Sequence, residues 1–111
     1  MDEFELLVEE AIESLPDDLR AFMSNVAVVI DEEPPAGLPL LGLYQGVPLT
    51  QRTSGYAGVA PDKITIYRGP LERRAAGDPG RLRAEVRRVV VHEIAHHFGI
   101  SDERLLELDR Y

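Results

Sequence analysis

Several residue types are absent or scarce in this chain of 111 residues. Cysteine and tryptophan do not occur, and a single lysine stands against eleven arginines. Without cysteine the protein can form neither a disulfide nor a thiolate metal site. No segment approaches the run of about 20 apolar residues that a membrane span needs, and the acidic start Met1-Asp2-Glu3 is unlike a signal peptide. We therefore expect a cytoplasmic protein that does not contact a membrane.

Positive charge is scarce in the first third of the chain. The net charge of the whole protein is −8, and residues 1–33 hold eleven acidic residues against one arginine, Arg20. This acidity argues against general nucleic-acid binding, because the phosphate backbone is itself negative. The simplest interpretation of the acidic segment is a solvated helix face, and the alternative is a role in selecting charged partners.

The length and the hydrophobic pattern predict one small α+β domain, residues 1–111, in which a three- to four-stranded sheet packs with helices. Apolar residues at helical spacing predict a helix over residues 2–14 and a short second helix over 17–23. The continuous apolar run 26–30 is rich in β-branched residues and predicts a buried central strand. The other expected elements are strands over 40–45 and 63–68, a break at Gly69-Pro70, and helices over 71–76, 81–98 and 102–110. A glycine-rich loop over 46–61 is long for a compact domain and is expected to be functional.

The most informative residues lie on the predicted long helix. His92 and His96 are four residues apart, roughly 40° around the helix axis and one turn along it, so both imidazoles can reach one metal ion. Glu93 lies roughly 100° from His92 and can take a proton from a metal-bound water. Gly99 can adopt a positive φ angle, end the helix and return Asp102 as a third ligand. Two imidazoles, a carboxylate and a water form the usual shell of a catalytic zinc ion.

Each of these residues also has a simpler interpretation. The two histidines could be surface residues that happen to share this spacing, and Glu93 could be a solvated helix residue. Asp102 follows Ser101, where an acidic residue in the first turn of a helix is favoured anyway, and Glu103 is the substitute ligand.

Three further residues each have two interpretations. His97 lies roughly 100° from His96 on the apolar side, which predicts a partly buried core histidine, with hydrogen bonding around the metal ligands as the alternative. Arg88 shares the side of the histidines and is predicted to be solvated, with binding of a substrate carboxylate as the alternative. Tyr56, in the long loop, is the preferred phenol for stabilising an oxyanion, and packing on the core is its alternative.

Residues 92–102 match the pattern H-E-x-x-H-x-x-G-x-x-D. With this pattern, its short length and the segment 42–50, the chain resembles the small bacterial minimal metalloproteases, a zincin-like family. The resemblance implies a zincin-like fold with the active helix near the C-terminus, a Zn²⁺ cofactor, and a peptide or protein substrate extended along an edge strand of the sheet. Metzincins also carry a methionine downstream of the third ligand. The only methionines here are Met1 and Met23, so we expect the chain to lack the lower half of a full-length zincin.

These observations predict a zinc metalloendopeptidase in which His92, His96 and Asp102 bind the metal and Glu93 is the general base. Two alternatives stay open, a non-catalytic peptide- or protein-binding module on a zincin scaffold and a purely structural metal site. The sequence does not predict the oligomeric state.

Overall fold

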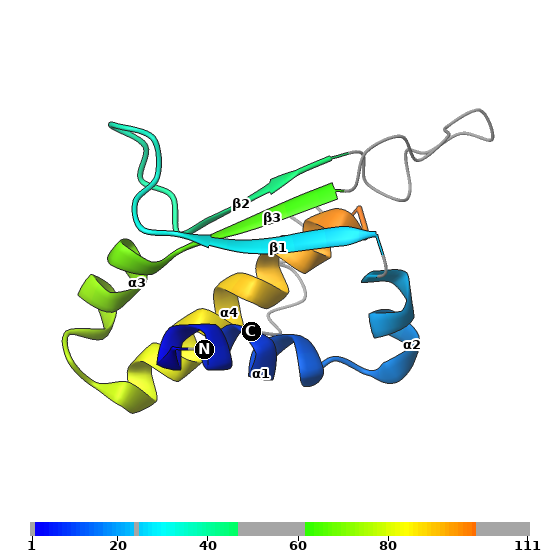
Figure 1. Ribbon diagram of the computed structural model, residues 1–111, viewed down its shortest axis with the longest axis horizontal. Helices are drawn as coiled ribbons and strands as arrows, with labels where there is room; N and C mark the ends of the chain where they lie inside the picture. Colours follow the sequence, from blue (N-terminus) through cyan, green and yellow to red (C-terminus); the bar gives the residue numbers. More distant parts are fainter. Residues whose placement is uncertain (1, 24, 47–61, 100–111) are drawn as a thin grey trace.

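The computed structural model describes residues 2–23, 25–46 and 62–99. Helices α1 to α4 lie on one side of a three-stranded sheet (Figure 1). The fold is α+β, as predicted. The elements are α1 (Glu3–Glu13), α2 (Asp17–Arg20), the 3₁₀ helix η1 (Ala21–Met23), β1 (Val26–Asp31), β2 (Gly42–Gln45), β3 (Asp62–Tyr67), α3 (Arg68–Ala75) and α4 (Pro79–His97).

The strand order of the sheet is β1-β3-β2, with β1 parallel and β2 antiparallel to β3. The prediction that residues 26–30 form the central strand was therefore wrong, because β3 occupies the centre. Its Ile64 and Ile66 are fully buried, whereas Ala27 of β1 is exposed. A continuous apolar run indicates that a strand is buried, but it does not encode the strand's place in the sheet order. Helices cover one face of this sheet, so β1 needs burial on that face alone.

The helix ends follow local chemistry. Asp2 caps α1, since its carboxylate accepts a hydrogen bond from the Glu5 backbone N–H at 2.8 Å. Asp78 caps α4 in the same way through the N–H groups of Gly80 and Arg81, and Pro79 takes the first helical position, where a missing N–H is harmless.

Gly69-Pro70 was expected to separate β3 from the next helix, but α3 begins directly after β3, at Arg68. Pro70 is then in the first turn, where its missing N–H costs no helical hydrogen bond. The predicted extra short helix before α4 is therefore present and begins three residues earlier than expected. The helix predicted over 102–110 and most of the loop over 46–61 lie outside the described residues.

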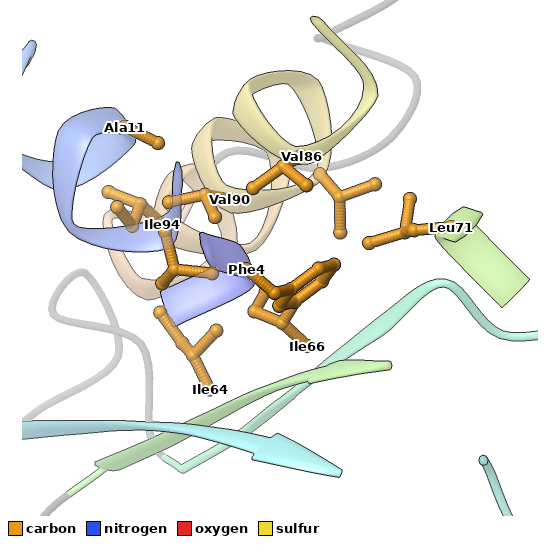
Figure 2. Packing of buried hydrophobic residues seen from close by; sticks show 10 residues of the cluster. Phe4, Ala11, Ile64, Ile66, Leu71, Val86, Val90 and Ile94 are labelled. Carbon is orange, nitrogen blue, oxygen red and sulfur yellow. The ribbon is translucent and has the colours of Figure 1, made fainter. Parts of the chain in front are cut away.

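The hydrophobic core lies between the sheet and the helices α1, α3 and α4 (Figure 2). Each of these elements contributes one apolar face, so α4 is held by the N-terminal helix α1 as well as by β3 and α3, which directly precede it. The buried members are Phe4, Val8, Ala11, Ile64, Ile66, Leu71, Val86, Val89, Val90 and Ile94. Among the described residues, no helix combines the length and apolar character that crossing a membrane requires.

Candidate metal centre

The last two turns of α4 present His92 and His96 on the same side of the helix. Their Nε2 atoms are 3.2 Å apart, and the two rings are nearly perpendicular, at 81°. Two nitrogen ligands at about 2.0–2.1 Å from one ion, at a tetrahedral angle, lie about 3.3 Å from each other. The observed spacing therefore fits two ligands of one zinc ion. The same spacing also permits a hydrogen bond in which one ring nitrogen donates to the other.

Glu93 lies beneath the edge strand and is 8% exposed, so it is not the solvated residue of the simpler interpretation. The close approach of β2 to α4 at Gly42 confines it. A Cβ atom at Gly42 would lie 2.8 Å from Val89 Cγ1 and 3.1 Å from Glu93 Cγ, distances that leave no room for a side chain there. Strand β2 thus limits the positions that the Glu93 side chain can take.

A groove of about 270 Å³ opens beside His92 and Glu93. One wall comes from α4 and the other from the segment that leads into β2. Most of its lining is apolar, and Arg88 adds a positive charge from the exposed surface of α4. Its lining residues are Pro39, Leu40, Leu41, Gly42, Arg88, Val89, His92 and Glu93.

Helix α4 ends at His97, one residue after His96, and Gly99 follows two residues later. Gly99 has a φ angle of +84°, and its N–H donates to the His96 carbonyl at 2.9 Å. A residue with a side chain would be strained in this conformation, so the glycine allows the chain to turn away from the helix axis here. Asp102, the expected third ligand, and Tyr56, the expected oxyanion phenol, lie outside the described residues. Within residues 2–23, 25–46 and 62–99, no cluster of three or more histidine or acidic side chains could hold a metal ion.

His97 is more deeply buried than predicted and belongs to a polar cluster that the sequence did not reveal. Its Nδ1 lies 2.7 Å from Asp62 Oδ2, and the Tyr44 hydroxyl donates to the same oxygen at 2.7 Å. His97 and Asp62 are 2% and 1% exposed. Asp62 is 35 positions from His97 in the sequence, so no local pattern links them. The only signal in the sequence was the position of Asp62 directly before the predicted strand 63–68. An acidic residue at such a position is equally common in a turn, so it did not indicate a buried partner of His97.

Glu85 shares the side of α4 that carries the histidines, yet it is buried against α3. Its Oε2 accepts a hydrogen bond from Arg74 Nε at 3.1 Å. The side of α4 that carries the histidines is therefore covered by α3 at Glu85 and by β2 at Val89, and the groove lies beside its C-terminal half.

Comparisons with known proteins agree with this architecture. One solved structure, a conserved hypothetical protein from Thermus thermophilus, is similar over 86% of this chain and 91% of its own, with 28% identity and a TM-score of 0.58. No curated protein matches the chain. The family model for zincin-like metallopeptidases matches residues 23–111, a range that holds the whole sheet, α3, α4 and both histidines. The chain therefore belongs to the zincin-like metallopeptidase family.

Proposed function

We propose that this protein is a zinc-dependent endopeptidase, with His92, His96 and Asp102 as metal ligands and Glu93 as the general base. The observation that carries the proposal is the 3.2 Å separation of the two Nε2 atoms, beside a glutamate confined under the edge strand. A zinc ion held there would act as a Lewis acid and lower the pKa of a bound water toward neutrality.

Glu93 supplies the proton transfers. Its carboxylate takes the proton of the attacking water and later delivers it to the nitrogen of the departing amine, so the same side chain serves both halves of the reaction. Confinement by β2 supports this role, because a general base must stay within hydrogen-bond reach of the proton that it removes. Tyr56 is our candidate for stabilising the oxyanion.

The substrate is proposed to be an extended peptide or protein segment. In the described part of the chain, β2 pairs with β3 on one side only, so its other side offers backbone groups to an added strand. The groove beside His92 would take an apolar side chain of that segment, since Leu40, Leu41 and Val89 line it. Arg88 at its rim could pair with an acidic group of the substrate.

Metal analysis combined with a peptide-library digest tests this proposal. Protein purified without chelator should carry one equivalent of zinc and cleave peptides, and His92→Ala should lose both properties. A matched control is Glu9→Gln, which changes an exposed residue of α1 far from the histidines along the chain. Zinc binding without any cleavage would instead support a non-catalytic peptide-binding module. Loss of folding upon chelation would support a structural metal site.

A further inference from the structure

The buried cluster of Asp62, His97 and Tyr44 ties the end of helix α4 to the two paired strands β2 and β3. Asp62 is the first residue of β3, Tyr44 lies in β2, and His97 is the last residue of α4. Two groups meet at one carboxylate oxygen, Asp62 Oδ2. It lies 2.7 Å from His97 Nδ1 and accepts a hydrogen bond from the Tyr44 hydroxyl, also at 2.7 Å. The rings of Tyr44 and His97 also meet edge-on at 5.9 Å. The C-terminal turn of α4 is therefore fixed to two strands at one point.

Stability alone does not account for this cluster. A buried ionisable pair must be removed from water, and well-packed apolar residues of similar volume often stabilise a fold as well or better. The surrounding core offers such packing, since Ile64 and Ile94 are buried close by in the sequence. What the polar cluster adds is direction, because hydrogen bonds require a defined distance and angle and so restrain the rotation of the helix end more narrowly than apolar packing does.

Rotation of this helix end matters for the adjacent histidines. Side chains reach about 5–6 Å from the axis of an α-helix, so a rotation of about 10° moves an imidazole nitrogen by about 1 Å. Functional constellations need placement within about 0.5 Å. His97 directly follows His96, and the turn it anchors also contains Gly99, where the chain bends away.

We propose that Asp62, His97 and Tyr44 are positioning residues that set the rotation of the last turn of α4 and thereby the convergence of His92 and His96 on a metal ion. The proposal rests on the zinc site proposed above, and it assigns to this cluster a role in metal affinity rather than in catalysis itself. The Asp62 carboxyl also fills the space beside Gly46. The end of β2 and the start of β3 are therefore packed against each other at the same point.

The test measures zinc affinity by competition with a chelating dye, and the visible absorption of the cobalt-substituted protein as a report on ligand geometry. His97→Leu removes the hydrogen bond and keeps an apolar side chain. His97→Asn is the conservative variant, because its amide nitrogen stands near the position of Nδ1. Val86→Ala is the matched control, since it opens the core on the same helix without touching the cluster.

We expect His97→Leu to bind zinc at least about tenfold more weakly and to change the cobalt spectrum. His97→Asn should recover most of the affinity, and Val86→Ala should stay within about twofold of the unsubstituted protein despite its lower Tm. If His97→Leu does not fold, Tyr44→Phe replaces it in the test, because this variant removes only one hydroxyl from the cluster. We then expect a several-fold loss of zinc affinity. Zinc affinity and cobalt spectrum unchanged in the folded variants would overturn the positioning role. An unsubstituted protein that binds no zinc would instead overturn the proposed function, and the positioning role with it.

Discussion

At the scale of single residues, the proposed chemistry depends on two imidazoles that bind the metal, one carboxylate that completes the ligand set and a second carboxylate that transfers protons. The four-residue spacing of His92 and His96 brings both imidazoles to one side of α4, which is why the sequence was sufficient to predict that they lie together. The confinement of Glu93 depends on a strand that begins about fifty residues earlier, at Gly42. That part of the site was not predictable from local sequence.

Glu93→Gln tests the proton transfer separately from metal binding. The amide keeps the size of the side chain but cannot accept the proton, so the cleavage rate should fall by roughly 10²–10⁴-fold while one equivalent of zinc remains bound. The measurement is the initial rate of peptide cleavage together with metal content. Retention of the original rate by the zinc-loaded variant would show that another group is the base.

The partner of His97 illustrates what sequence reasoning missed at this scale. Helical periodicity placed His97 on the apolar side and so predicted its burial. It gave no indication of Asp62 or Tyr44, because their contact with His97 depends on how β2 and β3 pack over the helix end. Side-chain contacts between distant elements follow from the packing, which the hydrophobic pattern of each element does not specify.

Helix α4 and strand β2 are the elements that carry the site, and their close approach is a property of the pair. Gly42→Ala would place a methyl group 2.8 Å from Val89 Cγ1, and a β-branched side chain in a helix has few other rotamers to adopt. We expect a loss of about 1–3 kcal/mol in the free energy of unfolding, measured by urea denaturation.

Gly80→Ala is the control for this substitution. Gly80 lies in the first turn of α4, and a Cβ atom there would approach only Asp78 Oδ1, at 3.5 Å. The free energy of unfolding of Gly80→Ala should stay unchanged or rise by up to about 1 kcal/mol, because alanine favours the helix. Equal losses in both variants would contradict the close approach at Gly42.

The cap of α4 provides a second prediction for an element. Asp78 accepts hydrogen bonds from the backbone N–H groups of Gly80 and Arg81 at 3.0 and 3.2 Å. Asp78→Ala should lower the free energy of unfolding by about 1 kcal/mol, and Asp78→Ser should restore most of it. Thermal unfolding followed by circular dichroism measures both changes, and equal Tm values for the alanine and serine variants would argue against a capping role.

Helices and strands were predicted better than their arrangement. The three strands and the long helix were predicted from the hydrophobic pattern, and their observed ends differ from the predicted ones by at most two residues. The sheet order was wrong for β1, since hydrophobicity indicates burial but not neighbours. The early start of α3 was missed because Gly69-Pro70 is a common break after a strand and is also tolerated in a first helical turn.

At the scale of the whole molecule, we expect the free energy of unfolding to fall at acid pH because of paired carboxylates on the surface. A hydrogen bond from the Glu5 amide, and a second from Arg68, hold the pKa of Asp2 below its usual value of 3.8. Arg73 holds the pKa of Glu33 below 4.5. Because these pKa values are lower in the folded state, their contribution to stability is fully present above the unfolded values and disappears as the pH falls through the folded values.

Urea denaturation below pH 5 should therefore show stability falling as these carboxylates take up protons. In Glu33→Gln part of this dependence should be absent, because Arg73 then has no carboxylate to pair with there. The expected difference between the two proteins is small near pH 3 and larger near pH 6. A difference that does not change with pH would contradict the ion pair as its cause.

Chelation should leave the fold intact. The core is built from apolar residues between Phe4 and Ile94, and neither histidine of the proposed metal centre belongs to it. Treatment with EDTA should therefore abolish cleavage while the far-ultraviolet circular dichroism spectrum stays nearly unchanged. A cooperative loss of helical signal upon chelation would mean that the metal holds the domain together.

The docking of α1 on α4 has a consequence for folding. These two helices lie about seventy residues apart along the chain, and the parallel pairing of β1 with β3 also spans a long separation. Closing such long loops is slow, and the contacts that reward it form only after closure. The helix that presents both imidazoles thus gains its support late, from the far end of the chain, and the competence to capture a metal should arise together with global folding rather than before it.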